Sequence, residues 1–299
     1  MPTVVVTSNI LGDVVESIAG DDIEVITLMP VGVDPHDFQA SAQQVAQLND
    51  ADALIVNGGG FEEGILDVIE AAEGDGVPTF EALSTVSTIE NGEGEDDHDD
   101  HADEDDHDDH DDEDDHDDHD HSGVDPHFFT DPARMADAVD GISDFLAVTL
   151  DGIDVDGLEE RTSAYVAELE ALDADLEERF GALGEDRRVL VTNHEVFGYF
   201  AERYDFEEVG AVIPSGSTSD GADAAALAEL AEIVEHEGVS AIFSDESASD
   251  ELVQTLAAEV GDIEIVALYS ETLGPEGDPA GTYLGMIEVN AERIISALG

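Results

Sequence analysis

Residues 157–184 read GLEERTSAYVAELEALDADLEERFGALG, and this stretch separates two halves of the chain that share one alternating pattern. Apolar side chains recur along it at intervals that suit one face of a helix. They are Leu158, Ala164, Val166, Leu169, Leu172, Leu176 and Phe180. The spacing predicts one helix of more than 20 residues that ends at a glycine stop signal. Such a helix is long for a globular protein, so we expect it to bridge two folded units.

Both sides of this helix alternate short β-branched runs with amphipathic stretches. Expected strands cover residues 3–8, 23–29, 53–59, 77–83, 189–193, 207–214, 240–245 and 264–270, and a further helix covers 132–148. This alternation indicates βαβ units and parallel sheets. We predict an α/β fold of two Rossmann-like (β/α) lobes with parallel sheets joined by one long helix. The lobes are expected at 1–150 and 185–299, with the linking helix at 151–184.

The chain is extremely acidic. Its 299 residues contain 78 Asp and Glu against 7 Arg and no Lys, so the formal net charge is −71. At ordinary ionic strength this like charge would push the fold apart, whereas molar salt shrinks the screening length to about 3 Å. We interpret the composition as adaptation to a salt-rich environment and expect a halophilic protein. Such a surface could not neutralise phosphates, which disfavours nucleic acid and anionic membranes as partners and favours cations as ligands.

Cysteine is absent, which excludes a disulfide framework and a thiolate metal site. No segment approaches 18 apolar residues, and Met1 runs directly into the first expected strand. We therefore expect neither a membrane span nor a signal peptide within the given residues. The protein is then either cytosolic, or an export sequence has been removed and a start Met supplied.

Histidines outside the most acidic part of the chain occur in a suggestive pattern. The pentapeptide GVDPH appears twice and ends at His36 and at His127, while His194 directly follows the expected strand at 189–193. Proline restrains its own backbone and that of the residue before it, so each repeated His stands on a stiff stem. Zinc accepts imidazole nitrogen in near-tetrahedral geometry. Any one of these histidines alone would more often be a cap or core residue, but the three together favour a metal site. His236, in the charged segment EIVEHEG, is expected to be a solvated surface residue.

A carboxylate is expected as the fourth ligand, and its position after a strand favours Glu271 over two competing acids. Glu271 follows the last expected strand, while Asp245 and Glu246 follow the strand before it. Ligands of open parallel sheets bind outside the carboxyl ends of the strands, which suits either position. Each of these acids also has an ordinary interpretation as solvated surface in so acidic a chain.

Four segments, GVDPHDFQAS, DPHFFTDP, NHEVFGYFAERY and YLGMIEVNAERI, occur in an order that resembles the metal-binding lipoproteins of ABC importers, the zinc and manganese solute-binding family. The resemblance runs from about Thr3 to the C-terminus, excluding the acidic insert. It implies two lobes joined by a long helix and a metal between them, held by His36, His127, His194 and Glu271. ALYSETLG matches the late motif of the family, although Asp is common there.

The resemblance also implies a role. We expect an extracytoplasmic solute-binding protein, not an enzyme, that captures Zn²⁺ and delivers it to the permease and ATPase subunits of an importer. This role requires a location at the extracellular side of the cell membrane, and we expect a monomer there. A lipid anchor would hold it, and because the given chain lacks one, we expect that an export or lipoprotein signal is missing upstream of Met1. Three histidines favour zinc, whereas manganese-selective relatives tend to carry Glu at the third position, so Mn²⁺ stays an alternative.

A His-rich acidic insert at residues 93–121 resembles one seen in zinc-specific members of the family. It has almost no apolar residues, so we expect it to be disordered. Its seven histidines are expected to bind zinc weakly and exchange it quickly: His98, His101, His107, His110, His116, His119 and His121. The alternative is a merely solvated acidic tract. Two other functions also compete, a zinc-dependent hydrolase and a metal-storage protein that works through this insert.

Overall fold

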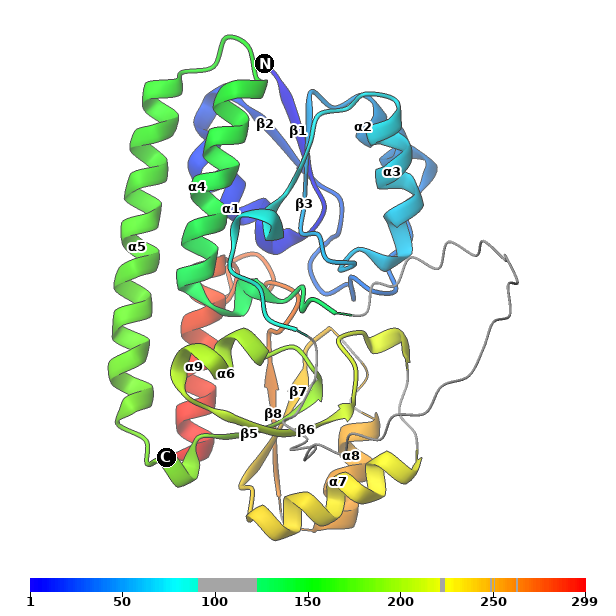
Figure 1. Ribbon diagram of the computed structural model, residues 1–299, viewed down its shortest axis with the longest axis vertical. Coiled ribbons are helices and arrows are strands. Elements are labelled where there is room, and N and C mark those ends of the chain that lie inside the picture. Colours follow the sequence, from blue (N-terminus) through cyan, green and yellow to red (C-terminus); the bar gives the residue numbers. More distant parts are fainter. Residues whose placement is uncertain (91–122, 221–223, 248, 250, 262) are drawn as a thin grey trace, which may run out of the picture.

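Two four-stranded parallel sheets lie one above the other beside a long helix (Figure 1). The structure, a computed structural model, describes residues 1–90, 123–220, 224–247, 249, 251–261 and 263–299. Its arrangement confirms the predicted α/β fold of two lobes with parallel sheets. Among the described residues, no helix combines the length and the apolar character needed to cross a membrane.

The first lobe contains a sheet in the order β2-β1-β3-β4. Its strands are β1 (Thr3–Val6), β2 (Glu24–Thr27), β3 (Ala53–Val56) and β4 (Thr79–Glu81). The helices that accompany it are α1 (Asn9–Ala19), α2 (Ala42–Asn49), α3 (Leu66–Gly74) and α4 (Pro132–Thr149). Because β1 and β3 are completely buried except at Thr3, they form the centre of the sheet, as expected for continuous apolar runs in parallel sheets.

The second lobe repeats this topology in the order β6-β5-β7-β8. Its strands are β5 (Val189–His194), β6 (Glu207–Ile213), β7 (Ala241–Asp245) and β8 (Glu264–Leu268). Its helices are α6 (Gly198–Tyr204), α7 (Ala224–Glu237), α8 (Glu251–Val260) and α9 (Tyr283–Leu298). In the first sheet, β2 lies on one side of β1, and β3 and β4 lie on the other side. In the second sheet, β6 lies on one side of β5, and β7 and β8 lie on the other side. This change of side creates a switch point at the carboxyl ends of the central strands, where open α/β sheets bind ligands.

The long helix α5 (Val155–Gly181) runs past both sheets (Figure 1). Its 27 residues correspond to about 40 Å at the helical rise per residue. The Asp154 side chain caps the N-terminus by accepting a hydrogen bond from the Gly157 N–H at 3.2 Å. The helix therefore begins within the expected segment 151–184, two residues before the quoted stretch that starts at Gly157. Its buried side chains recur every three or four residues: Leu158, Thr162, Tyr165, Leu169, Asp173, Leu176 and Phe180.

Two polar residues on the buried face of α5 were not expected from the apolar pattern, and Ala164, which was expected there, is exposed. The Asp173 carboxylate accepts two hydrogen bonds from the Arg203 guanidinium, at 2.9 and 2.6 Å, and one from the Tyr204 hydroxyl at 3.1 Å. Thr162 donates a hydrogen bond to the Ser143 hydroxyl on α4 at 2.9 Å. These side chains tolerate burial because each has a partner on a neighbouring helix.

One cluster of buried apolar side chains continues from the first lobe into the second. It includes Leu11 on α1, Leu169 on α5, Phe200 on α6 and Ile294 on α9. A smaller cluster that includes Val5 covers the other side of the first sheet. A third cluster, which includes Val191, does the same for the second sheet. Because the largest cluster belongs to both lobes, apolar packing joins them directly.

Shortening Leu169 to Ala should destabilise the protein by about 2 to 5 kcal/mol, since the side chain is fully buried in the shared cluster and the change leaves a cavity. The measurement is urea unfolding at constant molar KCl. The matched control is Leu172→Ala on the same helix, whose side chain is only partly buried and should cost clearly less. Equal losses for the two variants would contradict the assignment of the buried face.

Candidate metal-binding site

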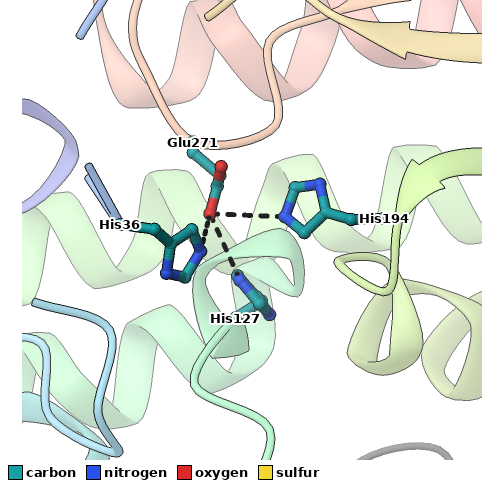
Figure 2. Close-up of side chains that lie close together, drawn as sticks. All are labelled: His36, His127, His194 and Glu271. Carbon is teal, nitrogen blue, oxygen red and sulfur yellow. Dashed lines mark hydrogen bonds and ion pairs between the residues drawn. The ribbon is translucent and has the colours of Figure 1, made fainter. Parts of the chain in front are cut away.

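The side chains of His36, His127, His194 and Glu271 point toward one another (Figure 2). One candidate ligand atom from each lies within 4.8 Å of the others, and all four residues are buried. His36 comes from the loop between β2 and α2, and His127 immediately precedes the 3-10 turn Phe128–Thr130. His194 is the last residue of β5 rather than the first after it, and Glu271 lies in the loop after β8. The structure thus brings together all four residues expected to form one site.

The three imidazoles point their Nε2 atoms at a single carboxylate oxygen (Figure 2). Glu271 Oε1 lies 2.8 Å from Nε2 of His36, 3.3 Å from Nε2 of His127 and 3.4 Å from Nε2 of His194. The ring centroids lie 5.6 to 5.9 Å apart. This convergence from both lobes is the arrangement that a single tetrahedral cation needs.

Several polar atoms of this cluster are buried without a hydrogen-bond partner in the described part of the chain. They are His36 Nδ1, His127 Nε2, both ring nitrogens of His194 and Glu271 Oε2. Each unsatisfied buried group costs about 1 to 3 kcal/mol. A cation bound to the Nε2 atoms and the carboxylate would compensate part of that cost, so the donor set suits a metal ion.

The two GVDPH repeats form similar stems. In the first, Asp34 Oδ1 accepts a hydrogen bond from the His36 backbone N–H at 3.0 Å. In the second, Asp125 Oδ1 accepts from the His127 backbone N–H at 2.8 Å and also lies 2.7 Å from His127 Nδ1. Such Asx turns fix the backbone of the residue that follows the proline. Asp125 therefore also orients the His127 ring, in the way that carboxylates commonly orient metal-binding histidines.

Side chains from the second lobe hold both stems. The Thr218 hydroxyl donates to Asp34 Oδ2 at 2.7 Å. The Tyr199 hydroxyl donates to the Asp125 backbone carbonyl at 2.6 Å. From the first lobe, the Glu63 carboxylate lies 3.7 Å from His36 Nδ1, and its side chain is 41% exposed. No sequence pattern indicates these supporting residues, apart from the Asp that both GVDPH pentapeptides contain.

Charge compensation dominates the electrostatics of the site. Burial alone would lower the pKa of His36, but the carboxylates of Glu271 and Glu63 raise it to about 10. Burial likewise opposes protonation of His127, while Asp125 and Glu271 raise its pKa to about 9. Burial would raise the pKa of Glu271, yet the surrounding histidines hold it well below its ordinary value. In the metal-free site His36 and His127 are therefore protonated and positively charged at neutral pH. A metal cation must displace a proton from each ring to bind there.

Neither competing carboxylate joins the four-residue cluster, although Asp245 lies close to it. Asp245 ends β7 and is buried, but its oxygens accept hydrogen bonds from Ser247 and Ser270. Burial and the nearby Glu271 raise its pKa. Glu246 pairs with Arg293 at 3.1 Å. His236 is exposed and contacts the Glu237 carboxylate at 2.9 Å, in agreement with the expected surface position. The seven histidines of residues 93–121 lie outside the described residues.

Comparisons with known proteins find similar sequences and the same fold in metal-binding proteins. Residues 4–297 match the family described as ZnuA, zinc-uptake complex component A, periplasmic. The chain is 30% identical to the zinc-binding protein TroA of Treponema pallidum, over 99% of this chain and 89% of that protein. It is 25% identical to the manganese-binding lipoprotein MntA of Halalkalibacterium halodurans, over 99% and 88%. The solved structure of the periplasmic zinc-binding protein TroA superposes with a TM-score of 0.84 at 28% identity and covers 100% of this chain and 99% of that one.

Stability of the metal-free protein should fall as the pH rises through about 9 to 10. The pKa values of His36 and His127 are raised on folding, so the stability they contribute is complete below about pH 6.5 and disappears as the folded rings lose their protons. The measurement is the free energy of unfolding in urea at a series of pH values, with a chelator present to remove metal and with the molar KCl concentration held constant.

The Glu271→Gln variant removes the charge that holds these protons, so its stability should depend less on pH over the same range. His236→Gln is the matched control, because that ring is exposed and far from the cluster in sequence. An identical pH dependence for the wild type and Glu271→Gln would contradict the role assigned to the carboxylate.

Proposed function

The chain belongs to the family of periplasmic zinc-uptake components, and we propose that it captures one Zn²⁺ between its lobes and delivers it to an ABC permease. The observation that supports this most directly is the convergence of three Nε2 atoms and one carboxylate oxygen in a buried site. His36, His127, His194 and Glu271 would hold the ion. His36 and His127 come from the first lobe and the other two from the second, so the ion would lie where the lobes meet.

Zinc is the cargo that this donor set favours. Three imidazoles and one carboxylate match a borderline-soft, tetrahedral ion better than one that prefers oxygen ligands. Relatives differ in this respect, since TroA is named for zinc and MntA for manganese. Manganese is therefore the second candidate.

A hydrolase is not supported. A catalytic zinc keeps one coordination position open for water, whereas four protein ligands here would close the site. The family consists of solute-binding proteins, which agrees with a role in capture rather than catalysis.

We further propose that the protein works as a monomer outside the membrane, with a permease and an ATPase as partners and a lipid anchor as attachment. The relatives named as lipoproteins support the anchor and the location. In a salt-rich surrounding, the surface charge would be screened while the buried site stays protected. The His-rich residues 93–121 would collect zinc weakly and pass it to the buried site.

Removing the ring of His194 should weaken zinc binding by about 100-fold or more, because even the loss of a residue that supports a metal ligand costs up to about 100-fold. The measurement is competition with a chelator in molar KCl, for chains with and without residues 93–121. Tight binding of a single zinc should survive the deletion, and manganese should bind more weakly. His236→Ala is the matched control.

Two results would contradict the proposal. If His194→Ala binds zinc at wild-type strength, the ion does not lie among these imidazoles. If the deletion of residues 93–121 abolishes tight binding, the metal-storage alternative replaces the transport function.

A further inference from the structure

The loop that carries Glu271 is held by a side chain of the first lobe. Asn9 is the first residue of α1, and its Oδ1 accepts a hydrogen bond from the Leu273 backbone N–H at 2.7 Å. Its Nδ2 donates to the Thr272 hydroxyl oxygen at 3.3 Å. The two residues that directly follow Glu271 are therefore bound to one amide from the opposite lobe.

The same hydroxyl also contacts the loop that leads to His36. The Gly32 backbone N–H donates to Thr272 Oγ1 at 2.7 Å. Gly32 adopts a left-handed backbone conformation with φ of 79°, which any other residue except Asn or Asp adopts only with strain. It stands at the start of the first GVDPH pentapeptide. Thr272 thus connects the loop of one metal ligand to the stem of another.

The Asn9 side chain is available for this contact because Ser8, and not Asn9, caps the N-terminus of α1. Ser8 is the N-cap of α1, and its hydroxyl accepts from the Leu11 N–H at 3.2 Å. Asn9 is 7% exposed and Thr272 is 1% exposed, so water does not compete for these hydrogen bonds. A side chain that lost its partner here would leave buried polar atoms unsatisfied.

We propose that Asn9 and Thr272 form a latch between the lobes that sets the position of Glu271 and thereby the affinity for the captured ion. A metal site must be held to about 0.5 Å by its supporting residues. Glu has a long side chain, so its backbone must be fixed for Oε1 to reach all three imidazoles. Asn9 and Thr272 are positioning residues that act through Glu271. This inference rests on the proposed function, since it explains how the same site retains zinc.

The latch also couples two ligands. Because Thr272 Oγ1 contacts the turn before His36, displacement of the Glu271 loop would disturb the His36 stem as well. Breaking the latch should therefore increase the dissociation rate of the ion more than it changes the association rate.

Substitution of Thr272 in the full-length chain tests the latch. Thr272→Val keeps the shape of the side chain and removes the hydroxyl, whereas Thr272→Ser retains it. We expect Thr272→Val to weaken zinc binding by about 10- to 100-fold, the usual effect of losing a group that supports a metal ligand, and Thr272→Ser to restore it. Zinc supplied below one equivalent, with a competing chelator, confines the measurement to the tightest site.

Thr162→Val is the matched control. That threonine is also buried and also donates a hydrogen bond, to Ser143, but it lies between α4 and α5. It should lower stability without changing zinc affinity. Asn9→Ala provides a second variant, and combining it with Thr272→Val should weaken binding by less than the product of the single effects, since both act through one contact.

Wild-type affinity and dissociation rate in both Thr272→Val and Asn9→Ala would overturn the inference. So would an equal loss of affinity in Thr162→Val, because the effect would then be one of general stability. Failure of the wild type itself to bind a single zinc tightly would instead refute the proposed function, so the two failures are distinguishable.

Discussion

A carboxylate enclosed by three imidazoles is the interaction on which the rest of this structure depends. Glu271 is 1% exposed, and each neighbouring ring is 3% exposed or less. A charge buried this deeply is tolerated only beside compensating charges, and the raised pKa values of His36 and His127 express that compensation. In the metal-free protein protons supply the positive charge, and we propose that a divalent cation replaces them.

Both lobes contribute to this interaction because both sheets have the same strand order. The strands of each parallel sheet end toward the other lobe, so the loops that follow β2 and β8 meet the end of β5 at the site. A shared apolar cluster and the helix α5 connect the two lobes. Hydrogen bonds from Tyr199 and Thr218 then tie the two repeated stems to the second lobe.

Much of this arrangement could be predicted from the sequence, and the omissions have a common cause. The strands, the long helix and the repeated GVDPH stems are local patterns. Its position after the last strand favoured Glu271 over Asp245 only moderately, and the family resemblance strengthened that choice, because spacing alone does not show which strand end faces the histidines. The two identical pentapeptides differ in their contacts: Asp125 reaches its own His ring, while Asp34 accepts from Thr218. Residues so far apart in the chain produce no periodic sequence pattern, so these contacts could not be predicted. The contact of Asp173 on α5 with Arg203 was missed for the same reason.

The most direct test of the central claim is X-ray absorption at the zinc edge, with one equivalent of Zn²⁺ bound to protein that lacks residues 93–121. Removing that segment excludes its histidines from the signal. The account predicts a four-coordinate ion with three imidazole nitrogens and a carboxylate oxygen at about 2.0 to 2.2 Å. A six-coordinate shell of oxygen atoms, or a spectrum with fewer than two imidazoles, would contradict it.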